Sequence, residues 1–187
     1  MKKRTNYVDN KRMYEEIVEY RKKLFDCREK GMPDPKIPEY IGECIYKIAN
    51  NLSTKPSFVN YSYRDEMISD GILNCFQYFN DYDPEKGKNP FAYFTQVIYY
   101  AFIRRINSEE KNRYTIYKNF QETIIGTQDS TLLVDSDDNH LMPTQMYDNI
   151  SSFMENFERK EKERVLKRKR IRDDTEKESS DKLKDFC

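Results

Sequence analysis

The sequence predicts an all-α fold, in which a helical bundle is followed by an extended, partly disordered C-terminal segment. Apolar residues recur at intervals of three and four through the first part of the chain, and strand alternation is hard to find. The composition is 37% hydrophobic and 35% charged, so not all of the chain can be core. A length of 187 residues suits one compact domain with extensions.

Four helices are expected in the bundle, at about 10–30, 38–52, 62–80 and 89–107. Gly31 ends the first helix, Ser62 can cap the third, and Asn89 caps the fourth with Pro90 at its first position. The apolar sides of the first three are Met13, Ile17, Tyr20 and Leu24; Ile41, Cys44, Ile45, Ile48 and Leu52; and Ile68, Ile72, Cys75, Phe76 and Phe79. The turn DPEKG, which joins the last two helices, has proline and glycine where a tight turn uses them.

The chain is expected to fall into four parts. The bundle covers 1–107, and a helical extension covers 108–127. An acidic, proline-broken stretch at 128–156 is predicted to be a linker, and 157–187 is a basic segment with a polar tail.

Composition and spacing exclude several function classes. The four cysteines are far apart without a C-x-x-C pair, so we expect reduced thiols in a cytoplasm and no metal. No window has the roughly 20 apolar residues of a membrane helix. The single histidine, His140, has no catalytic partners, and a glycine-rich phosphate loop is missing, so neither an enzyme nor a cofactor is expected.

Two helix faces are candidates for binding. On the third helix Glu66, Asp70, Asn74 and Gln77 form an acidic and amide stripe opposite the apolar side. This stripe fits either a solvated surface or a basic partner. On the fourth helix Phe91, Phe94, Ile98, Ala101 and Phe102 point inward, and Tyr93, Gln96, Tyr100, Ile103, Arg104 and Asn107 point outward. The outward groups fit either cover for a neighbouring helix or nucleic acid, which amides, rings and guanidinium groups can bind.

The order of the third helix, the DPEKG turn and NPFAYFTQVIYYAFIRRI resembles region 2 of the bacterial sigma factors. Together with YVDNKRMYEEIVEY and IPEYIGECIYKIANNLS, it is similar to the late-transcription sigma factors of T4-type bacteriophages over about two thirds of the chain. The resemblance implies a sigma region 2-like bundle. Its two surfaces, facing opposite ways, would bind host core RNA polymerase, at the β′ coiled coil, and promoter DNA.

The resemblance also assigns residues. The polymerase contacts would be Asp65, Glu66, Ser69, Asp70, Asn74 and Gln77. The promoter contacts in the bundle would be Tyr82, Tyr93, Gln96, Val97, Tyr100, Ile103 and Arg104. Gln96 and Val97 stand where major sigma factors have a tryptophan pair. Since the chain contains no tryptophan, strong strand opening by this chain alone is in doubt.

The C-terminal third offers two further contacts. We define the basic run as Lys167, Arg168, Lys169, Arg170 and Arg172, which could neutralise phosphates or be a solvated helix face. After Asn107 nothing resembles sigma region 4, so recognition would depend on one A·T-rich minus-ten element. In the T4-type family a coactivator and the sliding clamp supplement the affinity, and Leu183 and Phe186 could anchor a clamp-binding tail.

The expected function is that of a late-gene sigma factor in the cytoplasm of an infected bacterium. The alternative is a polymerase-binding coactivator or antagonist that does not read DNA. A non-specific single-strand binder is a second alternative, although it would need a broader basic groove than Arg104, Arg105, Lys111 and Arg113 provide.

Overall fold

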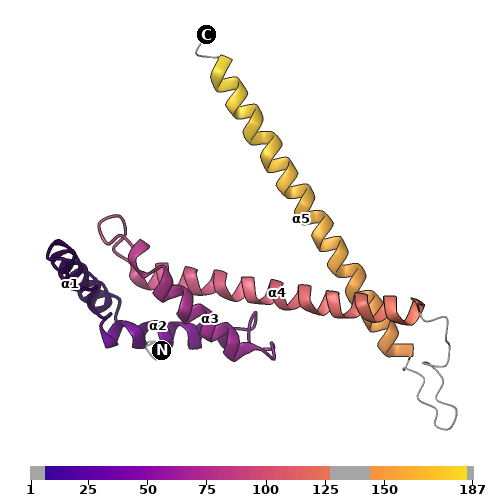
Figure 1. Ribbon diagram of the computed structural model, residues 1–187, viewed down its shortest axis with the longest axis horizontal. Coiled ribbons are helices and arrows are strands. Elements are labelled where there is room, and N and C mark those ends of the chain that lie inside the picture. Colours follow the sequence, from indigo (N-terminus) through magenta and orange to yellow (C-terminus); the bar gives the residue numbers. More distant parts are fainter. Residues whose placement is uncertain (1–6, 127–143, 185–187) are drawn as a thin grey trace, which may run out of the picture. The chain divides into compact units, whose positions relative to one another are not determined.

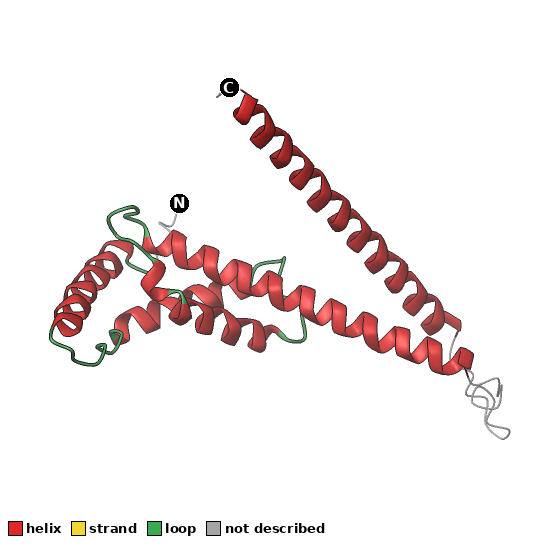
Figure 2. Cartoon of the chain, turned by 45° about the horizontal axis from the view of Figure 1, so that its top comes forward, coloured by secondary structure: helices red, strands yellow, loops and turns green. Residues whose placement is uncertain are grey.

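The computed structural model describes residues 7–126 and 144–184, with side chains described for 7–123 and 148–176. Throughout these residues the regular elements are helices (Figures 1 and 2), which confirms the all-α prediction. They are α1 (Asn10–Glu29), α2 (Glu39–Ser53), α3 (Arg64–Gln77), the short 3₁₀ helix η1 (Phe79–Asp81), α4 (Pro90–Gly126) and α5 (Thr144–Lys184). The chain divides into two compact units, unit 1 (Met1–Asn107) and unit 2 (Ser108–Cys187).

The helix ends of unit 1 follow ordinary capping chemistry. The Asp9 carboxylate accepts hydrogen bonds from two backbone amides of the first turn of α1, at 3.0 and 3.2 Å. Gly31, with φ +66°, lies just past the other end of α1, where a left-handed residue is common. The Asn89 side chain accepts from the Ala92 amide at 3.1 Å, which confirms the predicted cap of α4. The prediction for Ser62 was wrong, because the residue before α3 is Tyr63 and it makes no side-chain cap.

The core of unit 1 is built from the helix faces that the apolar spacing indicated. All four predicted core residues of α1 are buried, as are all five of α2. From α4, Phe94, Ile98 and Phe102 are fully buried. Burial raises the pKa of the Cys75 thiol in α3 to about 12, so this side chain is a neutral, apolar part of the core.

A close approach of α3 to α4 places the surface groups described below. Gly71 lies in the middle of α3, opposite two fully buried side chains of α4. A Cβ atom at Gly71 would be 3.0 Å from Ile98 Cγ2 and 3.1 Å from Phe102 Cε1. Glycine therefore allows these two helices to pack more closely than a larger residue would permit.

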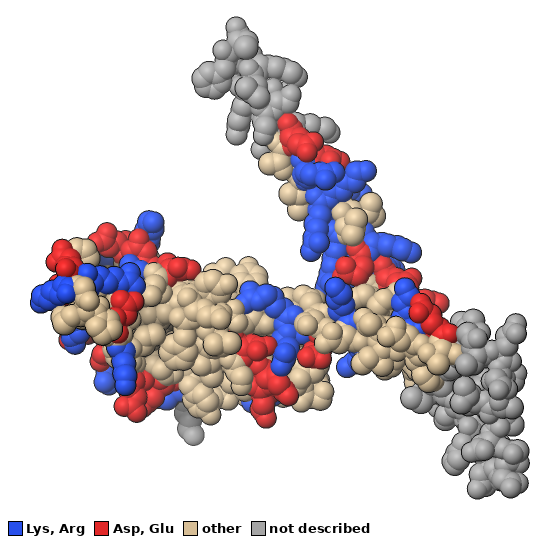
Figure 3. Space-filling view, viewed as in Figure 1, with Lys and Arg blue, Asp and Glu red and all other residues tan. Residues whose placement is uncertain are grey.

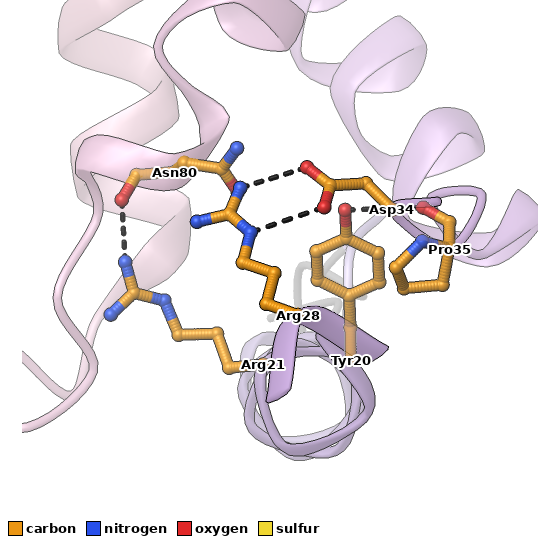
Figure 4. A network of polar contacts seen from close by, with 6 residues as sticks. All are labelled: Tyr20, Arg21, Arg28, Asp34, Pro35 and Asn80. Atoms are coloured by element: carbon orange, nitrogen blue, oxygen red, sulfur yellow. Dashed lines mark hydrogen bonds and ion pairs between the residues drawn. The ribbon is translucent and has the colours of Figure 1, made fainter. Parts of the chain in front are cut away.

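A polar network ties α1 to neighbouring loops (Figure 4). Arg28 holds Asp34 through two hydrogen bonds of 3.1 and 2.8 Å, and this pairing lowers the pKa of the Asp34 carboxyl. The Tyr20 hydroxyl donates to the Pro35 carbonyl at 3.3 Å, and Arg21 donates to the backbone carbonyl of Asn80 in η1. The network fixes the loop that follows α1 and joins α1 to the region after α3.

In unit 2, aromatic rings join the end of α4 to the start of α5. Tyr114 stacks on Phe157 with ring centroids 4.6 Å apart, and Tyr117 meets Phe153 edge to face at 5.5 Å. The Tyr114 hydroxyl also donates to Glu158 at 2.9 Å, which raises the pKa of the tyrosine. These contacts pair the two helices in antiparallel fashion, since residue numbers rise along one as they fall along the other.

The predicted linker at 128–156 was wrong for its second half, because α5 begins at Thr144. The physical reason is a short apolar stripe at helical spacing, formed by Ile150, Phe153, Met154 and Phe157. Ile150 and Met154 are buried, and the two rings pack against α4. The basic segment at 157–187, expected as a tail, is helical as far as Lys184.

Candidate functional site

The outer face of α3 presents the carboxylates and amides expected from the sequence. Asp65, Glu66, Ser69 and Gln77 are exposed or partly exposed, and Asp70 and Asn74 lie beside them at the border with α4. Two of the carboxylates lie in the first turn of the helix, where they also favour helix formation by interacting with its dipole. The stripe is therefore accessible to a partner. Its two first-turn carboxylates also stabilise the start of α3, whether or not a partner is bound.

This face also carries apolar side chains that sequence reasoning did not place there. Phe76, expected in the core, is 40% exposed, and Leu73 beside it is 55% exposed. Tyr46 of α2 is 57% exposed and lies across Gly42 from Phe76. Phe76 and Tyr46 line an open depression of about 420 Å³, which we call the α2–α3 depression. Its other lining residues are Ile37, Pro38, Glu39, Gly42 and Glu43.

The depression combines an apolar floor with two acidic residues at its rim. Exposed aromatic and aliphatic side chains rimmed by charge are typical of protein-binding surfaces. Phe76 was placed in the core because its position borders the apolar side of α3. A Cβ at Gly42 would lie 4.0 Å from the tip of the Phe76 ring.

On α4 the predicted outward residues divide into two groups. Tyr100 is 52% exposed, and Gln96 and Arg104 are also open to solvent on the same side of the helix. Tyr93, Val97 and Ile103 are partly buried and pack against the core. Only part of the predicted stripe is thus open to a ligand in this structure.

The exposed part of the stripe borders a groove between the end of α2 and the start of α4. This α4 groove measures about 520 Å³ and is lined by Leu52, Lys55, Asn89, Phe91, Ala92, Thr95, Gln96, Tyr99 and Tyr100. It therefore brings together one ammonium group, two side-chain amides and two exposed phenol rings. Lys55 and Tyr99 were not among the expected DNA contacts. Lys55 is remote in sequence from the fourth helix, and Tyr99 was considered only as cover for a neighbouring helix.

The two tyrosines of the groove are held differently. Tyr99 is 43% exposed, and the buried ring of Phe58 supports it edge to face at 5.8 Å. Tyr100 packs edge to face against Tyr99, with centroids 5.7 Å apart. Phe58 thus supports Tyr99, and Tyr99 supports the more exposed Tyr100. A supported ring that is open to solvent can stack on a planar ligand.

The assignment of Tyr82 to the DNA-binding surface was wrong, because its ring is only 4% exposed. The hydroxyl donates to the Gly87 carbonyl, and the ring lies 5.1 Å from Tyr93 and 6.0 Å from Phe94. Burial raises the pKa of Tyr82. This side chain therefore fixes the DPEKG turn from inside.

The outer faces of α3 and α4 border one another along a line of polar contacts between the two helices. Arg104 Nη2 donates to Asn74 Oδ1 at 2.6 Å, and Arg105 Nε lies 3.5 Å from Asp70 Oδ2. Asn74 in turn donates to the Asp70 carbonyl at 2.7 Å, which directs its oxygen toward Arg104. We call these four residues the α3–α4 seam; it joins two expected polymerase contacts to α4.

The basic run lies on α5, far along the helix from the aromatic contacts of unit 2. Its side chains are all exposed. Arg172 forms long ion pairs with Asp173 and Glu176, at 4.0 and 3.9 Å. The other four cations have no ion pair within the residues that the structure describes. Figure 3 shows lysine and arginine atoms gathered along this helix, so unit 2 offers a concentrated positive surface.

The remaining predicted contacts cannot be placed. Phe186 lies outside the described residues, and so does the side chain of Leu183. Among the described side chains, His, Cys, Asp and Glu do not gather into a group of three or more that could hold a metal ion. None of the described helices is both long and apolar enough to cross a membrane.

Comparisons with protein-family models and with curated proteins found no match to the chain.

Proposed function

We propose that this chain is a late-gene sigma factor, which binds bacterial core RNA polymerase and directs initiation at an A·T-rich minus-ten element. The observation that carries the proposal is the α4 groove, where amide, phenol and ammonium groups meet in the same unit as the acidic and apolar surface of α3. Stacking on an unpaired base needs exposed rings, and holding its phosphate needs a cation. Both are present in this groove.

On this proposal the outer face of α3 and the α2–α3 depression dock on the polymerase. Leu73, Phe76 and Tyr46 supply the apolar centre, and the surrounding carboxylates select a basic partner. The chemistry of RNA synthesis belongs to the polymerase, and this chain contributes binding and positioning. It acts without a cofactor.

The α4 groove holds the displaced DNA strand. Tyr100 stacks on an unpaired base, Gln96 bonds to a base edge, and Lys55 contacts a phosphate. An A·T-rich element suits such a site because its base pairs open easily. The basic run adds non-specific attraction to the duplex, and a coactivator and the sliding clamp supply further affinity, the latter through Leu183 and Phe186.

The test is transcription by purified bacterial core polymerase and this chain, on supercoiled templates with and without an A·T-rich minus-ten element. Start-site selection is expected only on the first template. Tyr100→Ala should keep core binding but lose initiation, since stacking contributes roughly 1–3 kcal/mol per base. Phe25→Ala is the matched control, because it removes a ring that is 64% exposed on α1 and borders neither surface.

Two outcomes would contradict the proposal. Core binding without start-site selection would favour the alternative, a polymerase-binding coactivator or antagonist. Equal loss of initiation in Tyr100→Ala and Phe25→Ala would show that the groove is not the reading surface.

A further inference from the structure

The part of α5 that carries the basic run is exposed on every side. The rings that pack against α4 are those of Phe153 and Phe157, nearer the start of the helix. Within unit 2, by contrast, every described side chain of residues 165–172 is exposed. A stretch of this length makes more than two helical turns, at 3.6 residues per turn. No side of α5 is therefore packed along it.

Positive charge surrounds this stretch instead of following one face. Figure 3 shows lysine and arginine atoms along the helix, and the basic run has no acidic residue between its members. Successive residues of an α-helix are about 100° apart around its axis. Arg168 and Arg170 therefore lie on nearly opposite sides, and so do Lys167 and Lys169.

The apolar side chains of the same stretch do not form a stripe. Val165, Leu166 and Ile171 are 59%, 55% and 68% exposed, and their positions in the helix place them on three different sides. A helix that binds in an apolar groove of a protein, or that lies on a membrane, needs its apolar residues on one face. Residues 165–172 instead fit a partner that places negative charge on both sides of the helix.

We infer that residues 165–172 of α5 lie in the major groove of duplex DNA, where cations on opposite sides of the helix bind phosphates of the two strands. An α-helix with its side chains is about 10–12 Å across. The major groove of B-form DNA is about 12 Å wide and has a phosphate backbone along each border. Duplex RNA does not fit, because its major groove is deep and narrow. This inference rests on the proposed function, which assigns the basic run to duplex DNA, and adds how the helix binds there.

The helical form of this stretch matters for such binding. Arg168 and Arg172 are four residues apart, and Lys167 and Arg170 are three apart. Like charges at these spacings repel one another and destabilise a helix. Phosphates on both sides neutralise these charges, so binding in the groove favours the helix. A flexible basic chain, in contrast, could follow a single phosphate backbone without being helical.

The first test removes one cation from each side of the helix. Binding of the full-length chain to a fluorescein-labelled B-form duplex of mixed sequence is measured by anisotropy over a range of salt concentrations. Arg168→Gln and Arg170→Gln should each lower the slope of log affinity against log salt concentration by about 0.9, the value for one phosphate contact. The matched control is Lys22→Gln, which removes one exposed cation from α1 and should leave the slope unchanged.

A second test keeps every cation and changes only the helix. Leu166→Pro breaks a helix interior and lies well beyond Phe157, so the contacts with α4 remain. It should weaken duplex binding about tenfold or more, because the segment must then pay for an unfavourable helix. Leu166→Ala is the matched control and should bind like wild type. Both variants should bind a single strand equally well.

The outcomes separate this inference from the proposed function. A lower slope in only one of the two arginine variants would overturn the groove, since the helix would then contact one strand. Equal duplex binding by Leu166→Pro and Leu166→Ala would also overturn it, because the basic run would act through charge alone. If neither arginine variant changed the slope, the proposed contact of the basic run with DNA would fail too. Start-site selection by the polymerase with this chain tests the sigma function independently of these results.

Discussion

The same substitution should have opposite effects at two glycines of unit 1. Gly42→Ala in α2 is expected to stabilise the protein, and Gly71→Ala in α3 is expected to destabilise it. Both residues lie inside helices, so both substitutions gain the same intrinsic helix preference, which favours alanine by about 1 kcal/mol. The difference between them comes from what a new methyl group would meet.

At Gly42 the nearest atom to the new Cβ is Phe76 Cζ at 4.0 Å, an ordinary contact, so the gain of about 1 kcal/mol remains. At Gly71 the methyl lies 3.0 and 3.1 Å from Ile98 and Phe102, which are fully buried and cannot move aside freely. Overpacking of this kind costs about 1–3 kcal/mol. The net effect of Gly71→Ala is then a loss of about 1 kcal/mol, roughly 2 kcal/mol away from Gly42→Ala.

Native-state hydrogen exchange measures this difference in unit 1 alone. The slowest amides of α4, at Ile98 and Phe102, report the free energy of opening the bundle. Protection should increase in Gly42→Ala and decrease in Gly71→Ala. If both variants gained protection equally, the close approach of α3 to α4 would not restrict side-chain size, and the packing described here would be wrong.

Three further predictions concern other parts of the molecule. The pKa of Cys75 is raised to about 12 in the folded protein, so the native thiol keeps its proton at a pH where the unfolded thiol, with its ordinary pKa, has lost it. The free energy of unfolding, measured by unfolding titrations, should therefore fall as pH rises above about 9. It should fall less in Cys75→Ala. In unit 2, Phe157→Ala should free α5 from α4, lowering helix content by circular dichroism, whereas Phe25→Ala on α1 should leave it unchanged. Replacing the five cations of the basic run with glutamine should reduce the slope of log affinity against log salt concentration when the polymerase-bound chain binds duplex DNA. The reduction should be at most about 0.9 for each phosphate that is no longer neutralised. An unchanged slope would show that the basic run does not contact the DNA.

The bundle was predictable because its core is made by amphipathic helices with clear periods. Met13, Ile17, Tyr20 and Leu24 follow each other by four and three residues, and the structure buries all of them. Asn89 followed by proline is a strong local signal for a helix start, and the structure confirms it. Such signals act within one helix, so tertiary packing did not have to be known.

The start of α5 was missed although a signal was present. Ile150, Phe153, Met154 and Phe157 have helical spacing, but the acidic residues and Pro143 before them suggested a loop. This helix has few apolar contacts, and its stability depends on aromatic pairs with α4 that single-helix reasoning cannot see.

The candidate site was predictable only in part. Tyr82 has extended backbone, with φ −69° and ψ 117°, so helical periodicity says nothing about its burial. The α3–α4 seam needs the distance between two helices, which depends on packing at Gly71. Gln96 and Tyr100 were placed correctly on the outer side because both lie within one regular helix.

The buried Tyr82 has a consequence for the loop that it anchors. Its hydroxyl bonds to Gly87, Asp83 accepts from the Glu85 amide at 3.0 Å, and the Tyr14 hydroxyl donates to Pro84 at 3.3 Å. A loop that had to become ordered on binding would lose about 1–2 kcal/mol of conformational entropy per residue. The DPEKG turn is already ordered by these hydrogen bonds within the protein. A ligand that bound at the turn would therefore not have to offset this loss of conformational entropy.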